Sequence, residues 1–228
     1  MKTYEHKTAF TLIEMLIVVA VIAVLITITV SVATRLDTQS KHTLLKGTMD
    51  IIDAALAQFR DFGYRYNSDP TWGDDEREFY LSLKYPVDCN DLLPADFTAE
   101  LQKTLGATSV TITSGIHDRQ YTGCEVMCFF LNKIPESKKT LNNIDRSLIT
   151  SEDINGHKLI MTITIGTDST DYSLTRIMDP WGQTLRYDYY DEVITDFGNR
   201  KKTKRNFPIL TSAGPDRIFG TADDIKSR

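Results

Sequence analysis

The stretch that decides the fold reads AFTLIE over residues 9–14 and continues as MLIVVAVIAVLITITVSVAT over residues 15–34. The second part has no charged residue, no glycine and no proline. A helix needs about 20 apolar residues to span a bilayer, and this segment has that length. Hydroxyl side chains within it can donate back to helix carbonyls, which lowers the cost of burying them. These residues are Thr27, Thr29, Ser31 and Thr34.

Glu14 places a carboxylate at the start of this hydrophobic run. Ionisable residues at membrane depth are costly and are functional candidates by default. A plain membrane anchor would gain nothing from Glu14. A secretory signal peptide would have a shorter apolar stretch followed by a small-residue cleavage site, which Ser31-Val32-Ala33 resembles weakly. Both alternatives stay open beside the interpretation that follows.

Residues 9–14 resemble the processing site of type IV prepilins and pseudopilins. In that family a membrane aspartyl peptidase cuts before the Phe and methylates the new amino terminus. The resemblance implies cleavage between Ala9 and Phe10, N-methylation of Phe10, and Glu14 at the fifth mature position. The family usually has glycine before the cut, where this chain has Ala9.

Cleavage would create an α-amino group on Phe10, four residues before Glu14. Four residues of helix rise about 6 Å, so Glu14 can meet the Phe10 ammonium of a neighbouring subunit displaced along a filament. Such a pair attracts strongly in a low dielectric, while either charge alone is penalised. We therefore expect Glu14 to set the register between subunits of a helical homo-oligomer.

One long helix is expected from Phe10 to about Asp61, because no proline occurs before Pro70. Its second half has apolar residues at spacings of four and three, which place them on one face. They are Leu45, Met49, Ile52, Leu56 and Phe59. The expected organisation is a leader (1–9), a transmembrane and filament-core helix (10–34), an amphipathic continuation (35–61) and a periplasmic head (62–228).

The head is expected to be α+β with a small antiparallel sheet, giving a pilin-like fold class. A loop is expected over 63–73 and strands over 158–165, 184–190 and 207–210. Residues 74–156 form an inserted region of unassigned role. Within that region helices are plausible at 76–83 and 95–105, 109–113 is β-prone, and 126–131 fits either a strand or a buried helix.

Three carboxylates and two glycines lie close together near the C-terminus, in the segment SAGPDRIFGTADDI (212–225). Oxygen ligands on a tightly turned backbone suit Ca²⁺, although an acidic surface turn has the same composition. With DPWG (179–182), this segment resembles the C-terminal part of the major pseudopilin of type II secretion systems, in which calcium orders the loop. The resemblance implies a structural Ca²⁺ in a loop region at 207–228. Its ligands would be the carboxylate of Asp216 together with that of Asp223 or Asp224, with the Ala213 carbonyl and one carbonyl near Ile218–Phe219.

Composition excludes several other functions. The formal net charge of −5 argues against nucleic-acid binding. The four histidines are scattered along the chain, so no histidine-based metal site is expected. No catalytic constellation is present in the spacing, so no enzyme activity is expected.

Cys89, Cys124 and Cys128 are either buried thiols or include one disulfide from Cys89 to one of the other two. The basic run RKKTKR (200–205) fits a solvated hairpin loop better than a partner patch.

The two resemblances together imply a pseudopilin held in the inner membrane by a single helix, with its C-terminal head in the periplasm. It would assemble with copies of itself and with minor pseudopilins, after processing by prepilin peptidase, on an inner-membrane platform. Filament growth would drive protein export across the outer membrane. The alternatives are a pilin of a pilus or DNA-uptake machine and, less favoured, a membrane-anchored binding domain.

Overall fold

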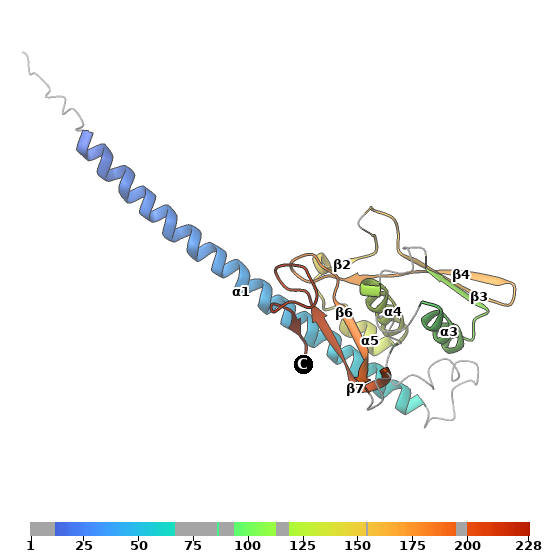
Figure 1. The fold of residues 1–228 in the computed structure, drawn as a ribbon. Helices are drawn as coiled ribbons and strands as arrows, with labels where there is room; N and C mark the ends of the chain where they lie inside the picture. Colours follow the sequence, from blue (N-terminus) through green and yellow to red (C-terminus); the bar gives the residue numbers. More distant parts are fainter. Residues whose placement is uncertain (1–11, 67–85, 87–93, 113–118, 154, 195–199) are drawn as a thin grey trace, which may run out of the picture. The chain divides into compact units, whose positions relative to one another are not determined.

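The computed structural model describes residues 12–66, 86, 94–112, 119–153, 155–194 and 200–228 (Figure 1). The chain divides into two compact units, Met1–Thr43 and Leu44–Arg228. Of the described residues, those in the first unit are all helical, and those in the second include the remaining helices and every strand.

Helix α1 (Leu12–Tyr66) confirms the expected long N-terminal helix and runs a little further than Asp61. The predicted loop from Gly63 was wrong over its first four residues, because Gly63–Tyr66 are helical. The rest of that predicted loop, 67–73, lies outside the described residues. Helix α1 passes Ser31 without interruption, as the absence of proline there predicts.

The first unit presents an apolar helix surface. From Leu12 to Ile26 its aliphatic side chains are exposed, with Leu12 at 85% and Ile26 at 58%. Thr27 Oγ1 donates to the Ala23 carbonyl at 2.9 Å and Thr29 Oγ1 to the Leu25 carbonyl at 2.8 Å, as expected for hydroxyls in an apolar helix. Among the helices in the described ranges, none is long and apolar enough to count as a candidate membrane span.

The second half of α1 supplies one wall of the core of Leu44–Arg228. All five residues of the predicted stripe, Leu45 to Phe59, are at most 2% exposed. They pack in one cluster with residues from across the second unit. The stripe is buried because its period matches the helix, so every apolar position falls on the same face.

The region from 94 to 148 builds the other helical part of the core. Its helices are α3 (Pro94–Leu105), α4 (Arg119–Lys133), α5 (Pro135–Leu141) and the short 3-10 turn η1 (Arg146–Leu148). The predicted helix at 95–105 is confirmed, and 126–131 proves to be buried helix within α4. Phe130 lies edge-on to Phe59 of α1, with ring centroids 6.4 Å apart. The predicted helix at 76–83 lies outside the described residues.

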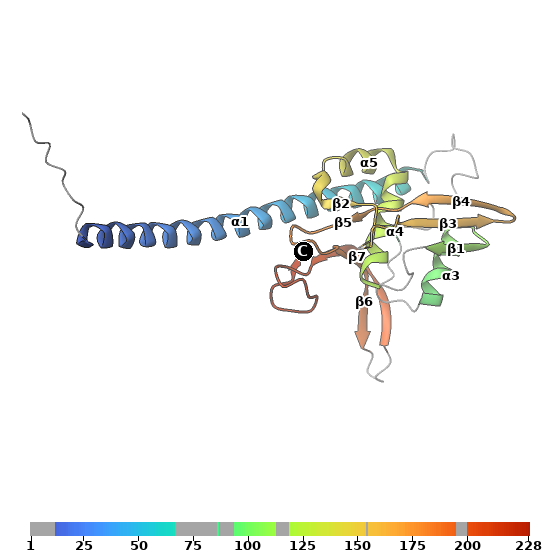
Figure 2. The same cartoon turned by 90° about the horizontal axis from the view of Figure 1, so that it is seen from above.

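The strands form three small antiparallel sheets, which confirms the α+β class with more than one sheet (Figures 1 and 2). Their strand orders are β1-β3-β4, β2-β5 and β6-β7-β8. The strands are β1 (Ser109–Ile112), β2 (Ile149–Thr150), β3 (Ile160–Ile165), β4 (Asp168–Ser173), β5 (Arg176–Ile177), β6 (Arg186–Ile194), β7 (Arg200–Ser212) and β8 (Ile225–Lys226).

Strand positions differ from the predictions in three places. Leu159, just before β3, and Met161 and Ile163 within it are buried as predicted, but Ile165 is 58% exposed because it ends the strand beside a turn at Gly166. The predicted strand at 184–190 begins at Arg186 and continues to Ile194. The basic run 200–205 is strand rather than loop, because it pairs with β6 from Ile194↔Arg200 to Tyr190↔Lys204.

The C-terminal residues are fastened to the part of α1 that belongs to the same unit. The Arg228 guanidinium lies over the Phe207 ring at 3.7 Å and donates to Asp53 Oδ2 through Nη2 at 3.1 Å. Burial raises the pKa of Asp53 despite this partner, because desolvation of the carboxylate outweighs the attraction of the guanidinium. The contact joins the end of the chain to the helix that carries the core stripe.

Candidate functional site

The predicted processing and assembly residues lie at the N-terminal end of the chain. Ala9 and Phe10 fall outside the described residues, and Glu14 lies in the first turn of α1. Glu14 lies among the exposed apolar side chains of the first unit, which begin with Leu12 and Ile13 on the same helix. A helix surface of this kind is suited to packing against similar helices rather than against water.

The C-terminal loop between β7 and β8 is closed by hydrogen bonds to its own carboxylates. Asp223 Oδ2 accepts from the Asp216 amide at 3.1 Å, and Asp223 Oδ1 accepts from the Thr221 hydroxyl at 2.6 Å. Asp216 Oδ1 accepts from the Ile218 amide at 2.8 Å. These contacts pull the two halves of the loop together around Asp223.

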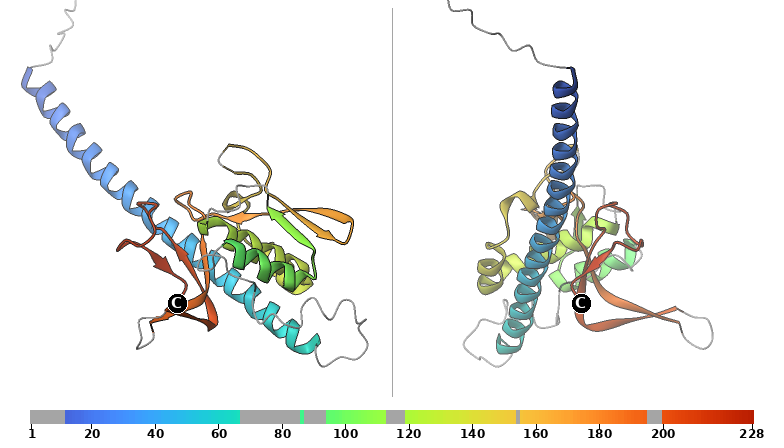
Figure 3. Two further views of the ribbon diagram at one scale, coloured as in Figure 1. Left: turned by 45° about the vertical axis from the view of Figure 1, so that its right-hand side comes forward. Right: turned by 90° about the vertical axis from the view of Figure 1, so that its left-hand side faces the viewer.

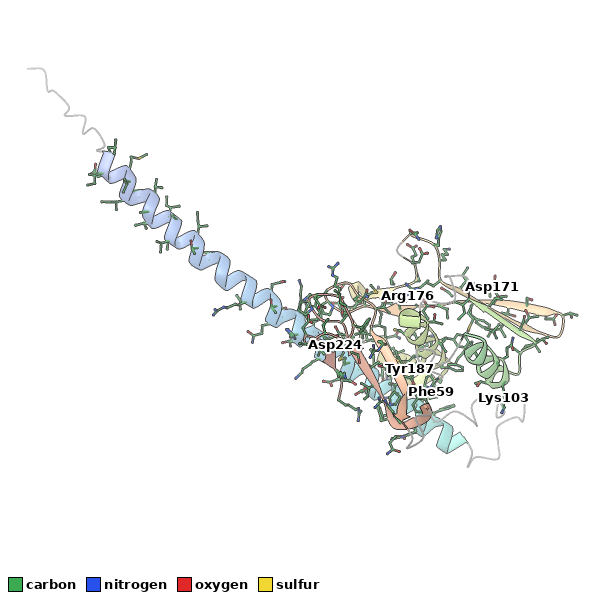
Figure 4. All side chains as sticks on the ribbon, viewed as in Figure 1. Phe59, Lys103, Asp171, Arg176, Tyr187 and Asp224 are labelled. Carbon is green, nitrogen blue, oxygen red and sulfur yellow. The ribbon has the colours of Figure 1, made fainter. Side chains whose placement is uncertain are left out.

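Asp224 holds the next turn of the same loop (Figure 4). Its Oδ2 accepts from the Gly220 amide at 2.8 Å. Its Oδ1 is buried and has no hydrogen-bond partner among the described residues. A buried carboxylate oxygen without a donor is costly, and it is one position at which a cation could bind.

Gly214 permits the close approach of the two halves of the loop. Its φ is +68°, and a Cβ built there would lie 2.4 Å from the backbone oxygen of Asp223. Any side chain at this position would therefore collide with backbone. The neighbouring Arg217 has φ 61° without being glycine, so the loop carries some backbone strain.

The carboxylates of this loop do not form a ready-made metal cluster. Across the described ranges, no group of three or more His, Cys, Asp or Glu side chains is arranged to hold a metal ion. Asp216 and Asp223 already accept hydrogen bonds within the loop, so a cation would have to displace some of them. The donor types fit Ca²⁺, and the open oxygen of Asp224 is the structural feature in favour of a site.

The pKa of Asp223 is lowered, first by the hydrogen bond from the Thr221 hydroxyl and then by the Asp216 amide. Both donors favour the ionised carboxylate. The loop therefore prefers Asp223 charged, whether or not a cation is bound.

Asp179 joins the two segments that carry the second resemblance. It is 1% exposed, and its Oδ1 accepts from the amides of Trp181 at 3.0 Å and Gln183 at 2.9 Å. Its Oδ2 accepts from the Ser212 hydroxyl at 2.6 Å, and Ser212 Oγ in turn accepts from the Gly214 amide at 3.1 Å. The DPWG turn is thereby tied to the start of the C-terminal loop through one buried carboxylate.

A second buried charge lies in the core, between α4 and β5 (Figure 4). Glu125 is fully buried and Arg176 is 6% exposed, and Arg176 Nε pairs with Glu125 Oε1 at 2.5 Å. Neither this pair nor the Asp179–Ser212 contact was expected from the sequence. The partners are 51 and 33 residues apart in the chain, so no local spacing signals them.

Two of the three cysteines are buried free thiols in α4. Cys124 Sγ accepts from the Ile177 amide at 3.4 Å. The pKa of Cys128 is raised well above its usual range, first by its contact with Cys124 and then by burial. The Cys128 thiol is therefore not activated as a nucleophile. Cys89 lies outside the described residues, so the predicted disulfide stays a prediction.

Residues 6–30 match the family model described as the prokaryotic N-terminal methylation motif. The matched range contains Ala9, Phe10 and Glu14, which are the residues singled out from the sequence. No curated protein and no solved structure matches the chain.

The matched motif supports a type IV pilin-like protein with a membrane-anchored N-terminus. It implies processing by prepilin peptidase and pilus-like assembly, and it points to a structural subunit. The long N-terminal helix followed by small antiparallel sheets is consistent with a pilin-like fold.

Proposed function

We propose that this chain is a pseudopilin, a structural subunit of the pseudopilus of a type II secretion system. The precursor would be held in the inner membrane by residues 10–34, with the head in the periplasm. Prepilin peptidase would remove residues 1–9 and methylate Phe10. The mature subunit would then assemble with copies of itself and with minor pseudopilins on an inner-membrane platform, and filament growth would move proteins across the outer membrane.

One observation carries this proposal. The methylation motif at 6–30 includes the first part of helix α1, whose apolar side chains are exposed from Leu12 to Ile26. A surface of this kind in water is unfavourable, and stacking such helices in a bilayer or a filament core removes it from water. In this arrangement Glu14 meets the Phe10 ammonium of a neighbouring subunit and fixes the stagger between them.

The role of Glu14 is tested by Glu14→Leu, with Leu16→Ala as a matched change on the same exposed helix. We expect Glu14→Leu to be inserted and cleaved normally but to yield few filaments, because the unpaired Phe10 ammonium would be buried. Leu16→Ala should assemble. Normal filament yield from Glu14→Leu would remove the proposed role, with processing unaffected.

The choice of a secretion system over a pilus or DNA-uptake machine rests on the C-terminal segments. The buried Asp179–Ser212 contact supports it, because it links the DPWG turn to the SAGPD loop that together resemble the secretion subunit. Deleting the gene should abolish export of secreted proteins while leaving surface motility and DNA uptake intact. The opposite pattern would favour the pilin alternative.

We further propose that the C-terminal loop binds one structural Ca²⁺. The ligands would be the carboxylates of Asp216, Asp223 and Asp224 with the Ala213 carbonyl, and the ion would supply charge neutralisation for a loop with few apolar contacts. The unpartnered Asp224 Oδ1 supports this assignment. Calcium should raise the melting temperature and EGTA should reverse it, whereas Asp224→Ala should abolish the response. An identical melting curve with calcium and with EGTA would contradict it.

A further inference from the structure

Strands β6 and β7 continue beyond their core pairing as a two-stranded arm rich in cations. We define the basic arm as residues 190–194 of β6 and 200–205 of β7. The two strands are paired there from Tyr190↔Lys204 to Ile194↔Arg200. It contains Arg200, Lys201, Lys202, Lys204 and Arg205 against the two carboxylates Asp191 and Glu192.

The arm is opposite in sign to the remainder of the chain. Five cations and two carboxylates give the arm a formal charge of +3, whereas the whole chain carries −5, so the other residues sum to −8. Over residues 200–210, the only strand that pairs with β7 among the described residues is β6, because β8 pairs only with Thr211 and Ser212. The arm is therefore a local positive feature on an acidic molecule.

A complementary surface lies on the β3–β4 hairpin, residues 160–173, which we call the acidic hairpin. Its only charged residues are Asp168 and Asp171, and both are exposed. Strand β4 forms one edge of its sheet. Around the carboxylates the sheet is polar: Thr162 donates to Asp171 at 2.6 Å and Thr164 contacts Ser169 at 3.0 Å. This hairpin offers negative charge with no cation of its own.

The basic arm and the acidic hairpin run in different directions from the second unit (Figures 2 and 3). Two complementary surfaces at separate places on one molecule can pair twice in a closed two-fold dimer, arm to hairpin and hairpin to arm, or once in a head-to-tail contact, which builds an open filament when the rotation does not close. The proposed filament requires the head-to-tail arrangement.

We propose that the basic arm of one copy binds the acidic hairpin of the next copy. The inference rests on the proposed filament and adds to it a contact between heads, independent of the N-terminal helices. The contact orients neighbouring heads, and as an exposed ionic contact it weakens as salt is raised.

A different role for the cations is possible on physical grounds, because lysines on an open strand edge discourage edge-to-edge aggregation. That role needs no acidic partner and predicts that any charged residue would serve in place of lysine. Charge reversal distinguishes the two, since glutamate protects an edge as well as lysine does but repels Asp168 and Asp171.

The test uses the full chain and compares filament yield among four variants. Lys201→Glu with Lys204→Glu, at positions opposite the uncharged Val193 and Tyr190, should lower the yield about tenfold, the effect of two surface ion pairs worth about 0.7 kcal/mol each. Lys138→Glu with Lys139→Glu, on exposed positions of α5, makes the same charge change and should leave the yield unchanged. Asp168→Lys with Asp171→Lys should also lower it, and combining this pair with the arm reversal should restore assembly.

A second measurement needs no variant. Filaments grown from mixed ¹⁴N- and ¹⁵N-labelled subunits are treated with a zero-length carbodiimide, which joins a lysine amine to a carboxylate only in direct contact. Peptides linking Lys201, Lys202 or Lys204 to Asp168 or Asp171 should contain both isotopes.

Unimpaired filaments from the arm reversal, or arm lysines linked only to carboxylates of their own chain, would overturn the contact. An arm reversal that is not restored by the combined variant would also overturn it. In each of these cases the wild-type filament stands, so the proposed function survives. A wild-type chain that forms no filament at all would instead remove the proposed function.

Discussion

Replacing Asp179 by alanine removes the carboxylate that ties the DPWG turn to the C-terminal loop. Three donors lose their acceptor: the half-buried amides of Trp181 and Gln183 and the buried hydroxyl of Ser212. Water can replace the acceptor for the two amides more easily than for Ser212. At about 1 kcal/mol for each amide and about 2 kcal/mol for the buried hydroxyl, the expected loss is about 4 kcal/mol. For a domain of this size, that lowers the melting temperature by about 10 °C.

The assay is thermal unfolding of a fragment from residue 35 to residue 228, which keeps every residue of the buried core. Asp179→Asn is the informative second variant, because its amide oxygen can still accept from the two backbone amides. It should lose about half as much stability as Asp179→Ala. Asp168→Ala, an exposed carboxylate on β4, serves as the matched control and should unfold with the parent.

Two results would refute this reasoning. One is a melting temperature for Asp179→Ala within about 2 °C of the parent, which would mean that the three donors find equal partners elsewhere. The other is an equal loss for Asp179→Asn and Asp179→Ala, which would assign the effect to charge alone and not to the hydrogen bonds.

Three further predictions concern the core and the loop. Glu125→Ala should destabilise the head by about 3–5 kcal/mol in urea, because it leaves Arg176 charged in the core; a loss below about 1 kcal/mol would contradict the buried pair. Phe130→Ala should cost about 4 kcal/mol by opening a cavity against α1, and a near-neutral effect would place that ring outside the core. Asp223 has a folded pKa below its unfolded value of about 3.9, so its contribution to stability is present above that pH and is lost as the pH falls through the folded pKa. An NMR titration of Asp223 checks this; Thr221→Val should raise its midpoint, and a parent midpoint at or above the ordinary value would contradict the prediction.

The sequence predicted a feature correctly where that feature depends on a single helix, strand or contiguous motif. The stripe from Leu45 to Phe59 is set by helical period, and the residues of the methylation motif follow one another directly, so both could be recognised without a fold. The strand at 160–165 was likewise predictable, except for Ile165 at its end, where no facing layer covers the side chain.

Contacts between distant segments were not predictable. Asp179 was recognised only as part of the DPWG segment that carries the second resemblance, because its acceptor role depends on Ser212, which comes from another strand. The run 200–205 has the composition of a loop, and pairing with β6 makes it strand, which local propensity cannot report. Residues 126–131 were ambiguous because a short, continuously apolar run suits a buried helix and a buried strand equally.

The measurement closest to the central claim is the intact mass and N-terminal sequence of the protein extracted from membranes. We predict a chain that begins at Phe10 and is heavier than that sequence by one methyl substitution on its α-amino group. A mature polypeptide that still begins at Met1, or one released after Ala33, would contradict the account, because the ammonium proposed to pair with Glu14 would not exist.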